Sequence, residues 1–271
     1  MIAKANSFHC TAFRVGFRLT ANSELLLSAM LQCAPFGAQV CARPSASTNY
    51  PSFALAKSPG RPDYCLIVDD QVIAESKELQ SLLDHLTRSL MVHVANYAPD
   101  RVFLHAGVVG WQGHALVLPG ASLAGKSTLV AELVRAGATY YSDEYAVLDE
   151  RGFVHPYPRD LQIRRPGSPE QSSMCVEQLD GIVGTTPLRV SRVVLTQYKA
   201  SAHWQPEPLS AGMAVLEMLQ HAIPVQRTPA RVMSTLTKMI ETATAVRSER
   251  GEANAAAHAL LAELTRNDPN L

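Results

Sequence analysis

Apolar residues in the second half of the chain recur with two different periods. Nearly unbroken apolar runs of strand length are typical of buried strands, whereas apolar residues three and four positions apart are typical of helices. These patterns predict strands at residues 102–109, 114–118, 139–141, 146–148 and 192–197. They predict helices at residues 127–136, 211–221, 231–247 and 253–264. Strands that alternate with helices indicate an α/β fold.

The N-terminal part of the chain has a different pattern. Alternation of apolar and polar residues at 13–19 predicts a strand, and residues 25–31 predict a short helix. Residues 65–74 predict a hairpin that turns at Asp69-Asp70. Between these elements, residues 42–62 are rich in Pro, Ser and Ala, and this composition predicts a surface loop.

The chain is long enough for one large domain with a small appendage, since it has 271 residues and 47% of them are hydrophobic. We expect a small β-rich subdomain over residues 1–76 and the main domain over residues 77–271. A helix at residues 78–94, with leucines at helical spacing, should connect the two.

Charge and cysteine content exclude several classes of protein. Lys+Arg and Asp+Glu number 24 each, and because no long basic run is present we expect no nucleic-acid partner. No apolar run approaches the length of a membrane span, so no membrane partner is expected. The five cysteines are odd in number and lack Cys-x-x-Cys spacing, which argues against a disulfide framework or a zinc site. Reduced thiols and a cytoplasmic location are the simplest interpretation.

Residues 120–128 read Gly-Ala-Ser-Leu-Ala-Gly-Lys-Ser-Thr and match the phosphate-binding loop Gly-x-x-x-x-Gly-Lys-[Ser/Thr]. Glycines let the backbone wrap around a polyphosphate and point its N–H groups inward. Lys126 can then reach the β- and γ-phosphates of ATP, and Ser127 can bind Mg²⁺. The alternative is a glycine-rich turn from strand to helix. The predicted nucleotide-binding residues are Gly120, Ala121, Ser122, Leu123, Ala124, Gly125, Lys126, Ser127 and Thr128.

An acidic pair, Asp143-Glu144, follows the predicted strand at 139–141, only a short distance after the loop. A carboxylate at this place can bind Mg²⁺ or accept a hydroxyl proton during phosphoryl transfer. A kinase needs such a group beside an incoming alcohol, whereas a hydrolase must position water. The predicted metal ligands are therefore Ser127, Asp143 and Glu144. The alternative for the pair is a solvated turn or a helix cap.

Four further residues are weaker candidates. His105 precedes the loop, in the strand at 102–109, and a single histidine in a strand is more often structural than functional. Arg159, Arg164 and Arg165 follow two prolines, and one of them can neutralise charge on the transferred phosphoryl group. We prefer Arg164, and the alternative is an ordinary basic loop.

The run of residues 105–149 resembles the catalytic domain of bacterial HPr serine kinase/phosphorylase. It contains His-Ala-Gly-Val-Val, the phosphate-binding loop, and Gly-Ala-Thr-Tyr-Tyr-Ser-Asp-Glu-Tyr-Ala-Val-Leu-Asp. It looks closest to the shorter HPr-kinase-related proteins found beside ribosomal-peptide gene clusters, including lasso-peptide kinases that modify a serine of a precursor peptide. The resemblance implies active-site roles for His105, Lys126, Ser127 and Asp143, with Asp143 as the base.

The chain departs from the family pattern at several points. Leu123 stands where the family usually has Gly, and Glu144 replaces the second Asp of the usual pair. The later Gly-Arg-Gly type signature is absent, and the residues before 77 do not resemble the regulatory domain of the full-length enzyme. Control of sugar transport is therefore not expected.

Together these features predict an α/β P-loop kinase core of the HPr kinase type with a small N-terminal β-rich subdomain. We expect it to transfer the γ-phosphoryl group of ATP, with Mg²⁺, to a serine of a peptide or small protein. The predicted catalytic residues are Asp143, His105, Lys126 and Arg164. Related kinases assemble as hexamers, so the resemblance also implies a homo-oligomer. The alternatives are a kinase of a sugar or amino-acid derivative and a non-catalytic binding module gated by a nucleotide.

Overall fold

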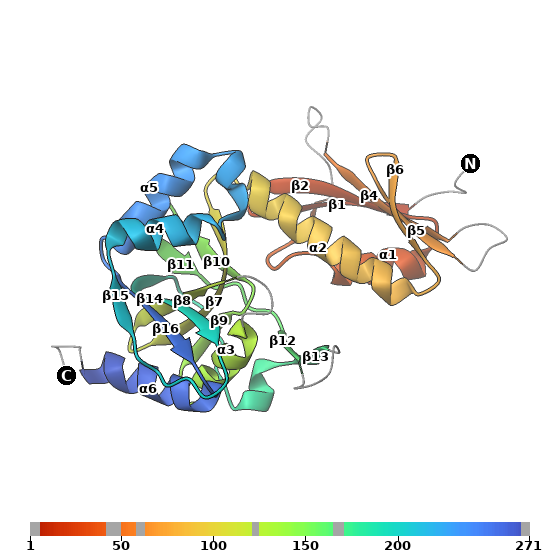
Figure 1. The fold of residues 1–271 in the computed structure, drawn as a ribbon. Helices are drawn as coiled ribbons and strands as arrows, with labels where there is room; N and C mark the ends of the chain where they lie inside the picture. Colours follow the sequence, from red (N-terminus) through yellow and green to blue (C-terminus); the bar gives the residue numbers. More distant parts are fainter. Residues whose placement is uncertain (1–5, 42–49, 58–62, 121–124, 165–170, 267–271) are drawn as a thin grey trace. The chain divides into compact units, whose positions relative to one another are not determined.

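The computed structural model describes residues 6–41, 50–57, 63–120, 125–164 and 171–266, and the chain forms two compact units, Met1–Asp100 and Arg101–Leu271 (Figure 1). The boundary lies after Asp100, not between residues 76 and 77 as expected. The difference arises because the helix expected to connect the domains, α2 (Leu79–Tyr97), packs on strands β5 and β6 of the first unit.

The first unit is a six-stranded sheet in the order β3-β1-β2-β4-β5-β6, and α1 and α2 pack on it. The strands are β1 (Asn6–Ala12), β2 (Val15–Ala21), β3 (Gln39–Cys41), β4 (Ser52–Lys57), β5 (Tyr64–Val68) and β6 (Gln71–Ser76). Helix α1 (Glu24–Gln32) is capped by the hydroxyl of Ser23, which accepts a hydrogen bond from the Leu26 amide at 3.3 Å. Asp69 and Asp70 form the β5–β6 turn with positive φ, as the hairpin prediction requires.

The second unit contains a mixed eight-stranded sheet. The strands along it are in the order β11-β10-β7-β8-β14-β16-β15, with β9 paired to β7. Their bounds are β7 (Val102–Trp111), β8 (His114–Pro119), β9 (Thr139–Ser142), β10 (Tyr145–Leu148), β11 (Phe153–His155), β14 (Leu188–Tyr198), β15 (Glu207–Leu209) and β16 (Thr244–Arg250). A separate hairpin pairs β12 (Leu161–Arg164) with β13 (Gln171–Met174).

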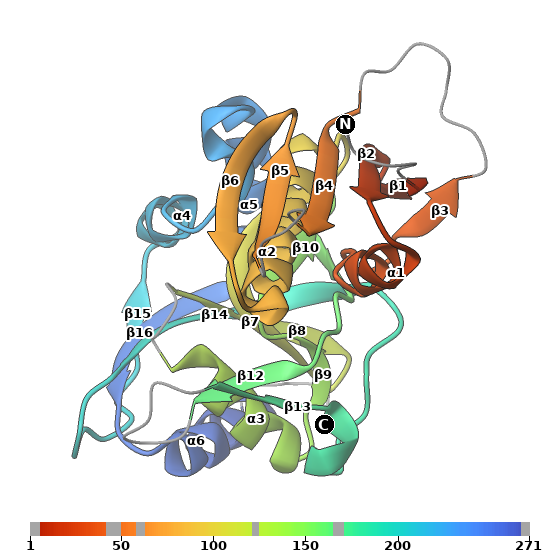
Figure 2. The same cartoon turned by 90° about the vertical axis from the view of Figure 1, so that its right-hand side faces the viewer.

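Helices cover both faces of this sheet (Figures 1 and 2). They are α3 (Lys126–Arg135), α4 (Ala211–Leu219), α5 (Pro229–Ile240) and α6 (Ala253–Arg266), with 3-10 turns at η1 (Val176–Leu179) and η2 (Ile223–Gln226). One buried cluster joins α4 and α5 to the sheet, and a second joins α3 and α6 to its other face. Val108 belongs to the first cluster and Val109 to the second, as the period of two in a strand requires. The unit is thus a three-layer α/β arrangement.

Two segments differ from the sequence-based prediction. Within the expected loop at 42–62, Ser52–Lys57 forms strand β4 between β2 and β5, and residues 42–49 and 58–62 lie outside the described part. The helix expected at 231–247 ends at Ile240, and Thr244–Arg250 forms β16 instead. Strand β16 pairs in parallel with β14, and this contact brings together residues 52 positions apart.

Among the described residues, no helix combines the length and apolar character needed to cross a membrane.

Candidate active site

Strand register gathers the candidate residues at one edge of the second sheet. In the antiparallel pair of β7 and β8, Ala106 faces Pro119, so His105 lies beside the start of the phosphate-binding loop. In the pair of β7 and β10, His105 faces Tyr145. The acidic pair directly precedes β10. Residues far apart in the chain therefore meet where these strands end or begin.

The acidic pair lies in a tight turn because two strands pair with different parts of β7. Strand β9 pairs with residues 108–110 of β7, and β10 pairs with residues 102–105. The chain must turn between them, and the buried hydroxyl of Ser142 accepts hydrogen bonds from the amides of Glu144 and Tyr145 at 3.1 and 3.0 Å. This turn directs the Asp143 side chain toward the first turn of α3, where it meets Ser127.

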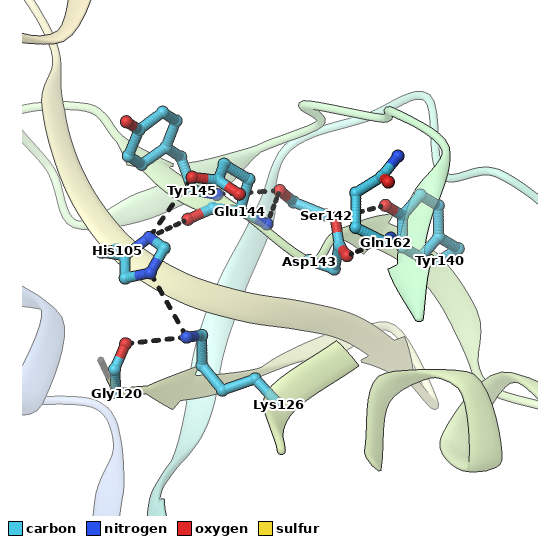
Figure 3. Close-up of polar contacts among 9 residues, drawn as sticks. All are labelled: His105, Gly120, Lys126, Tyr140, Ser142, Asp143, Glu144, Tyr145 and Gln162. Atoms are coloured by element: carbon cyan, nitrogen blue, oxygen red, sulfur yellow. Dashed lines mark hydrogen bonds and ion pairs between the residues drawn. The ribbon is translucent and has the colours of Figure 1, made fainter. Parts of the chain in front are cut away.

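Lys126 is held between two acceptors (Figure 3). Its Nζ donates a hydrogen bond to the Gly120 carbonyl at 2.8 Å and lies 3.3 Å from Nε2 of His105. The residue is only 8% exposed. Burial lowers the pKa of Lys126, and the nearby carboxylates of Glu144 and Asp143 oppose that shift.

The neighbours of His105 identify its tautomer. Nδ1 lies 2.9 Å from the Glu144 carbonyl oxygen, which can only accept a hydrogen bond, so Nδ1 carries the proton. Nε2 is then free of a proton and accepts from the Lys126 ammonium group. Burial and the charge of Lys126 lower the pKa of His105 to about 4, which keeps the ring neutral near pH 7. His105 thus orients Lys126 and does not present a free basic nitrogen to a substrate.

Asp143 is the most enclosed carboxylate of the site, at 6% exposure. It is hydrogen-bonded to the hydroxyl of Ser127, and its Oδ2 accepts a hydrogen bond from the Gln162 amide at 3.2 Å. The Tyr140 hydroxyl lies 3.3 Å from Oδ1 and 2.7 Å from the Arg159 carbonyl oxygen. Burial raises the pKa of Asp143 above its ordinary value, despite the opposing hydrogen bonds and the charge of Arg159. A raised pKa makes this carboxylate a stronger base than an exposed aspartate.

Glu144 has a more open position. Its side chain is 37% exposed, and Oε1 lies 3.6 Å from Nδ1 of His105. Burial and the charge of Asp143 raise the pKa of Glu144, while Arg159 and Lys126 lower it. The two carboxylates therefore differ in environment, because Asp143 is enclosed by donors and Glu144 remains accessible.

The oxygen donors fit a magnesium ion. Ser127 and Asp143 are in direct contact, and Mg²⁺ in nucleotide sites is commonly held by one or two protein oxygens together with phosphate oxygens and water. No group of three or more His, Cys, Asp or Glu side chains suited to a metal occurs in the described part of the chain. A magnesium ion would therefore be held by Ser127 and Asp143, with Glu144 beside them, together with oxygens of a bound nucleotide.

The structure describes only some of the remaining predicted site residues. Residues 121–124 of the loop (Ala121, Ser122, Leu123 and Ala124) lie outside the described part. Gly125 precedes α3 with φ +77°, and Thr128 is exposed in the first turn of the helix. The backbone of Arg164 pairs with Gln171 in the β12–β13 hairpin, its side chain is outside the described part, and Arg165 is outside it altogether.

No protein-family model matches the chain, and a search of curated proteins finds no similar sequence. A functional assignment must therefore rest on the geometry of the site itself.

Two residues near the site were missed or given too little weight from the sequence. Arg159, which the prediction ranked below Arg164, lies near enough to lower the pKa of Asp143, Glu144 and Tyr145. The prolines around it marked the segment but could not show that the charge of Arg159 acts on the acidic pair. His221 was not predicted at all, although its carbonyl accepts a hydrogen bond from the His105 amide at 2.8 Å. No local pattern distinguishes it, because the contact joins residues 105 and 221.

Proposed function

We propose that the protein is an ATP- and Mg²⁺-dependent kinase that phosphorylates a hydroxyl group, that of a serine in a peptide or small protein. The observation that carries this proposal is the contact of Ser127 with Asp143. It joins the serine of a phosphate-binding loop to a buried carboxylate, and Lys126 lies beside them. Nucleotide positioning, metal binding and proton acceptance would thus be concentrated within one site.

The side chains divide the reaction between them. Lys126, oriented by His105, would contact the β- and γ-phosphates. Asp143 would accept the hydroxyl proton as the acceptor oxygen forms its bond to the γ-phosphorus and the bond to the bridging oxygen of ADP breaks. Bound Mg²⁺ would neutralise phosphate charge. Arg159 would add positive charge near the transferred phosphoryl group and so stabilise the negative charge of the transition state.

A peptide acceptor is favoured over a small metabolite by the surface of helix α4. Met213 and Leu216 on this helix are 45% and 56% exposed, although both are large and apolar. The helix ends at Leu219, two residues before His221, which is bonded to His105. An exposed apolar helix face leading toward the site suits an extended chain better than a small polar molecule.

Transfer of label from γ-labelled ATP tests the proposal. Wild type would be incubated with Mg²⁺ and a panel of serine peptides, HPr and sugars, alongside Asp143→Asn and Lys126→Ala. We expect label on a peptide, with kcat lowered at least about 100-fold in Asp143→Asn while its Kd for ATP, measured without Mg²⁺, stays within a few-fold of wild type. Lys126→Ala should lose ATP affinity as well.

Asp149→Asn is the matched control, because Asp149 is also a buried carboxylate but lies at the far end of β10, where it binds His155 at 3.1 Å. This variant should retain kcat. Label on a sugar would redirect the proposal to a metabolite kinase. Tight ATP binding without transfer, unchanged in Asp143→Asn, would instead establish a nucleotide-gated binding module.

A further inference from the structure

Arg250, the last residue of β16, lies against the phosphate-binding loop although it is 125 positions away from it. Its Nη2 donates a hydrogen bond to the Gly125 carbonyl at 2.8 Å, and its Nη1 donates to the Gly251 carbonyl at 3.1 Å. Strands β8, β14 and β16 run parallel, so their carboxyl ends share one edge of the sheet. That shared edge explains how the end of β16 reaches the loop that follows β8.

The position is electrostatically unfavourable for an arginine in the absence of an anion. The side chain is 2% exposed and lies at the N-terminus of α3, where the helix dipole is positive and Lys126 adds a second charge. Within the described part of the chain, no carboxylate lies within salt-bridge distance of Arg250, although the charge of Glu252 acts on it from farther away, and its Nε has no hydrogen-bond partner. Burial of a charge without an ion partner is costly. A bound polyphosphate would supply a negative charge in direct contact with the guanidinium group.

Tyr198 fixes the direction of the guanidinium group. It is the last residue of β14, faces Arg250 in the strand register, and its ring centre lies 5.7 Å from the guanidinium carbon. This arrangement is a cation–π contact. Tyr198 is 48% exposed, whereas the arginine that its ring contacts is buried.

Gly125 is the residue at which the loop becomes helix, and Arg250 contacts it directly. Gly125 has a left-handed conformation with φ +77° and ψ +19°, and a Cβ there would collide with Nη2 of Arg250. The same Gly125 carbonyl accepts the first hydrogen bond of α3, from the Leu129 amide at 3.1 Å. Arg250 therefore holds the backbone at the point where α3 begins.

We propose that Arg250 is a positioning residue of the nucleotide site, which holds Gly125 and the N-terminus of α3 ready for the polyphosphate of a nucleoside di- or triphosphate. Its charge also stabilises the bound anion. The proposal rests on the nucleotide binding assumed in the proposed function, but it does not depend on the acceptor or on transfer. Holding the loop in its binding conformation reduces the ordering cost of binding.

The test measures Kd for ADP and for inorganic pyrophosphate, with Mg²⁺, by titration calorimetry at several salt concentrations. The variants are Arg250→Met, Arg250→Lys and Tyr198→Ala. Arg192→Met is the matched control, because Arg192 is a second buried arginine, on the neighbouring strand β14, with an ion pair to Glu263 at 3.3 Å. In the register, Arg192 faces Thr244 and Tyr198 faces Arg250, so the two arginines lie about 20 Å apart along the strands.

We expect Arg250→Met to weaken both ligands at least about 10-fold and to reduce the dependence of log Kd on log salt, because a charge near the anion is lost. Arg250→Lys should keep the salt dependence but lose part of the affinity, because an ammonium group cannot donate in the two directions that the guanidinium nitrogens do. Tyr198→Ala should weaken binding about 2- to 5-fold, and Arg192→Met should bind within 2-fold of wild type.

Equal Kd values for wild type and Arg250→Met would overturn the proposal, as would a loss of equal size in Arg192→Met. Circular dichroism of the ligand-free proteins separates affinity from unfolding. If Arg250→Met does not fold, affinities equal to that of wild type in both Arg250→Lys and Tyr198→Ala would overturn the proposal instead. If wild type bound neither ADP nor ATP, the proposed function would be overturned as well. If wild type bound them and substitution of Arg250 had no effect, only the present inference would be overturned.

Discussion

The contact between His105 and Lys126 shows how burial determines the protonation state of a side chain and therefore its role. Both side chains are ionisable, yet they can share a hydrogen bond only if the imidazole is neutral and accepts from the ammonium group. The low pKa of His105, about 4, meets this condition at physiological pH. Its Nδ1–H is simultaneously bound to the Glu144 carbonyl. The ring thus links the strand before the loop, the loop lysine and the acidic turn.

This linkage predicts a pH dependence of stability. The unfolded chain protonates this ring near pH 6.5, whereas the folded protein does so only near pH 4. Between these values the unfolded state binds more protons, so the free energy of unfolding should fall as pH is lowered from 7 toward 4. At about 1.4 kcal/mol per pKa unit, the contribution is roughly 3.5 kcal/mol at most. Urea unfolding of wild type and His105→Gln at pH 7 and pH 4.5 measures it.

The comparison with His105→Gln is needed because neighbouring groups titrate in the same range. The pKa of His221 is also lowered by burial and acts in the same direction, while the raised pKa values of Asp143 and Glu144 act in the opposite one. A variant that retained the full pH dependence of wild type would contradict the assignment to His105. The difference between the two proteins, and not the slope of either, is the informative quantity.

At the scale of the elements, tight turns place strands and helices relative to one another. Gly152, in the turn from β10 to β11, has φ +81°, and a Cβ there would lie 2.7 Å from the Met239 backbone nitrogen in α5. Gly113, in the turn from β7 to β8, has φ +78° but no atom within 4 Å of the same position. The two glycines share a conformation and differ only in the proximity of a helix.

Alanine substitution of these two glycines should therefore have unequal effects. Gly113→Ala carries only the left-handed backbone penalty, roughly 1 kcal/mol. Gly152→Ala adds a collision between β11 and α5 and should lower the free energy of unfolding by roughly 2–4 kcal/mol. Urea unfolding of the two variants measures this difference. Equal losses would show that α5 moves aside without cost.

The individual strands and helices also show which elements a local sequence pattern predicts correctly and which it does not. The Gly-x-x-x-x-Gly-Lys-Ser pattern, the strand before it and helix α3 could all be read locally, because each depends on residues close in the chain. Strand β16 could not, since the apolar spacing of α5 runs on into Thr244 with neither Gly nor Pro between them. Its pairing with β14 is a long-range contact. Arg250 was missed for the same reason, because without strand β16 nothing in the sequence places residue 250 at the edge of the sheet.

For the whole molecule, the division into two units determines how a ligand should act. Every residue of the candidate site, from His105 to Arg250, belongs to the unit Arg101–Leu271. The two buried clusters on either face of its sheet also draw only on that unit. A domain with its own core can gain stability from a ligand independently of its neighbour.

Hydrogen exchange with and without ADP and Mg²⁺ tests this expectation. At a ligand concentration 100 times Kd, binding adds about 2.7 kcal/mol, so amides of the second unit that exchange through its global unfolding should slow by about 100-fold. The amides of β2 and β4 in the first unit should exchange at unchanged rates, because no predicted ligand contact lies there. Lys126→Ala, with its affinity lost, should show no slowing in either unit. Equal slowing of β2 and β4 in wild type would mean that the two units unfold as one, and the ligand would then stabilise the entire chain.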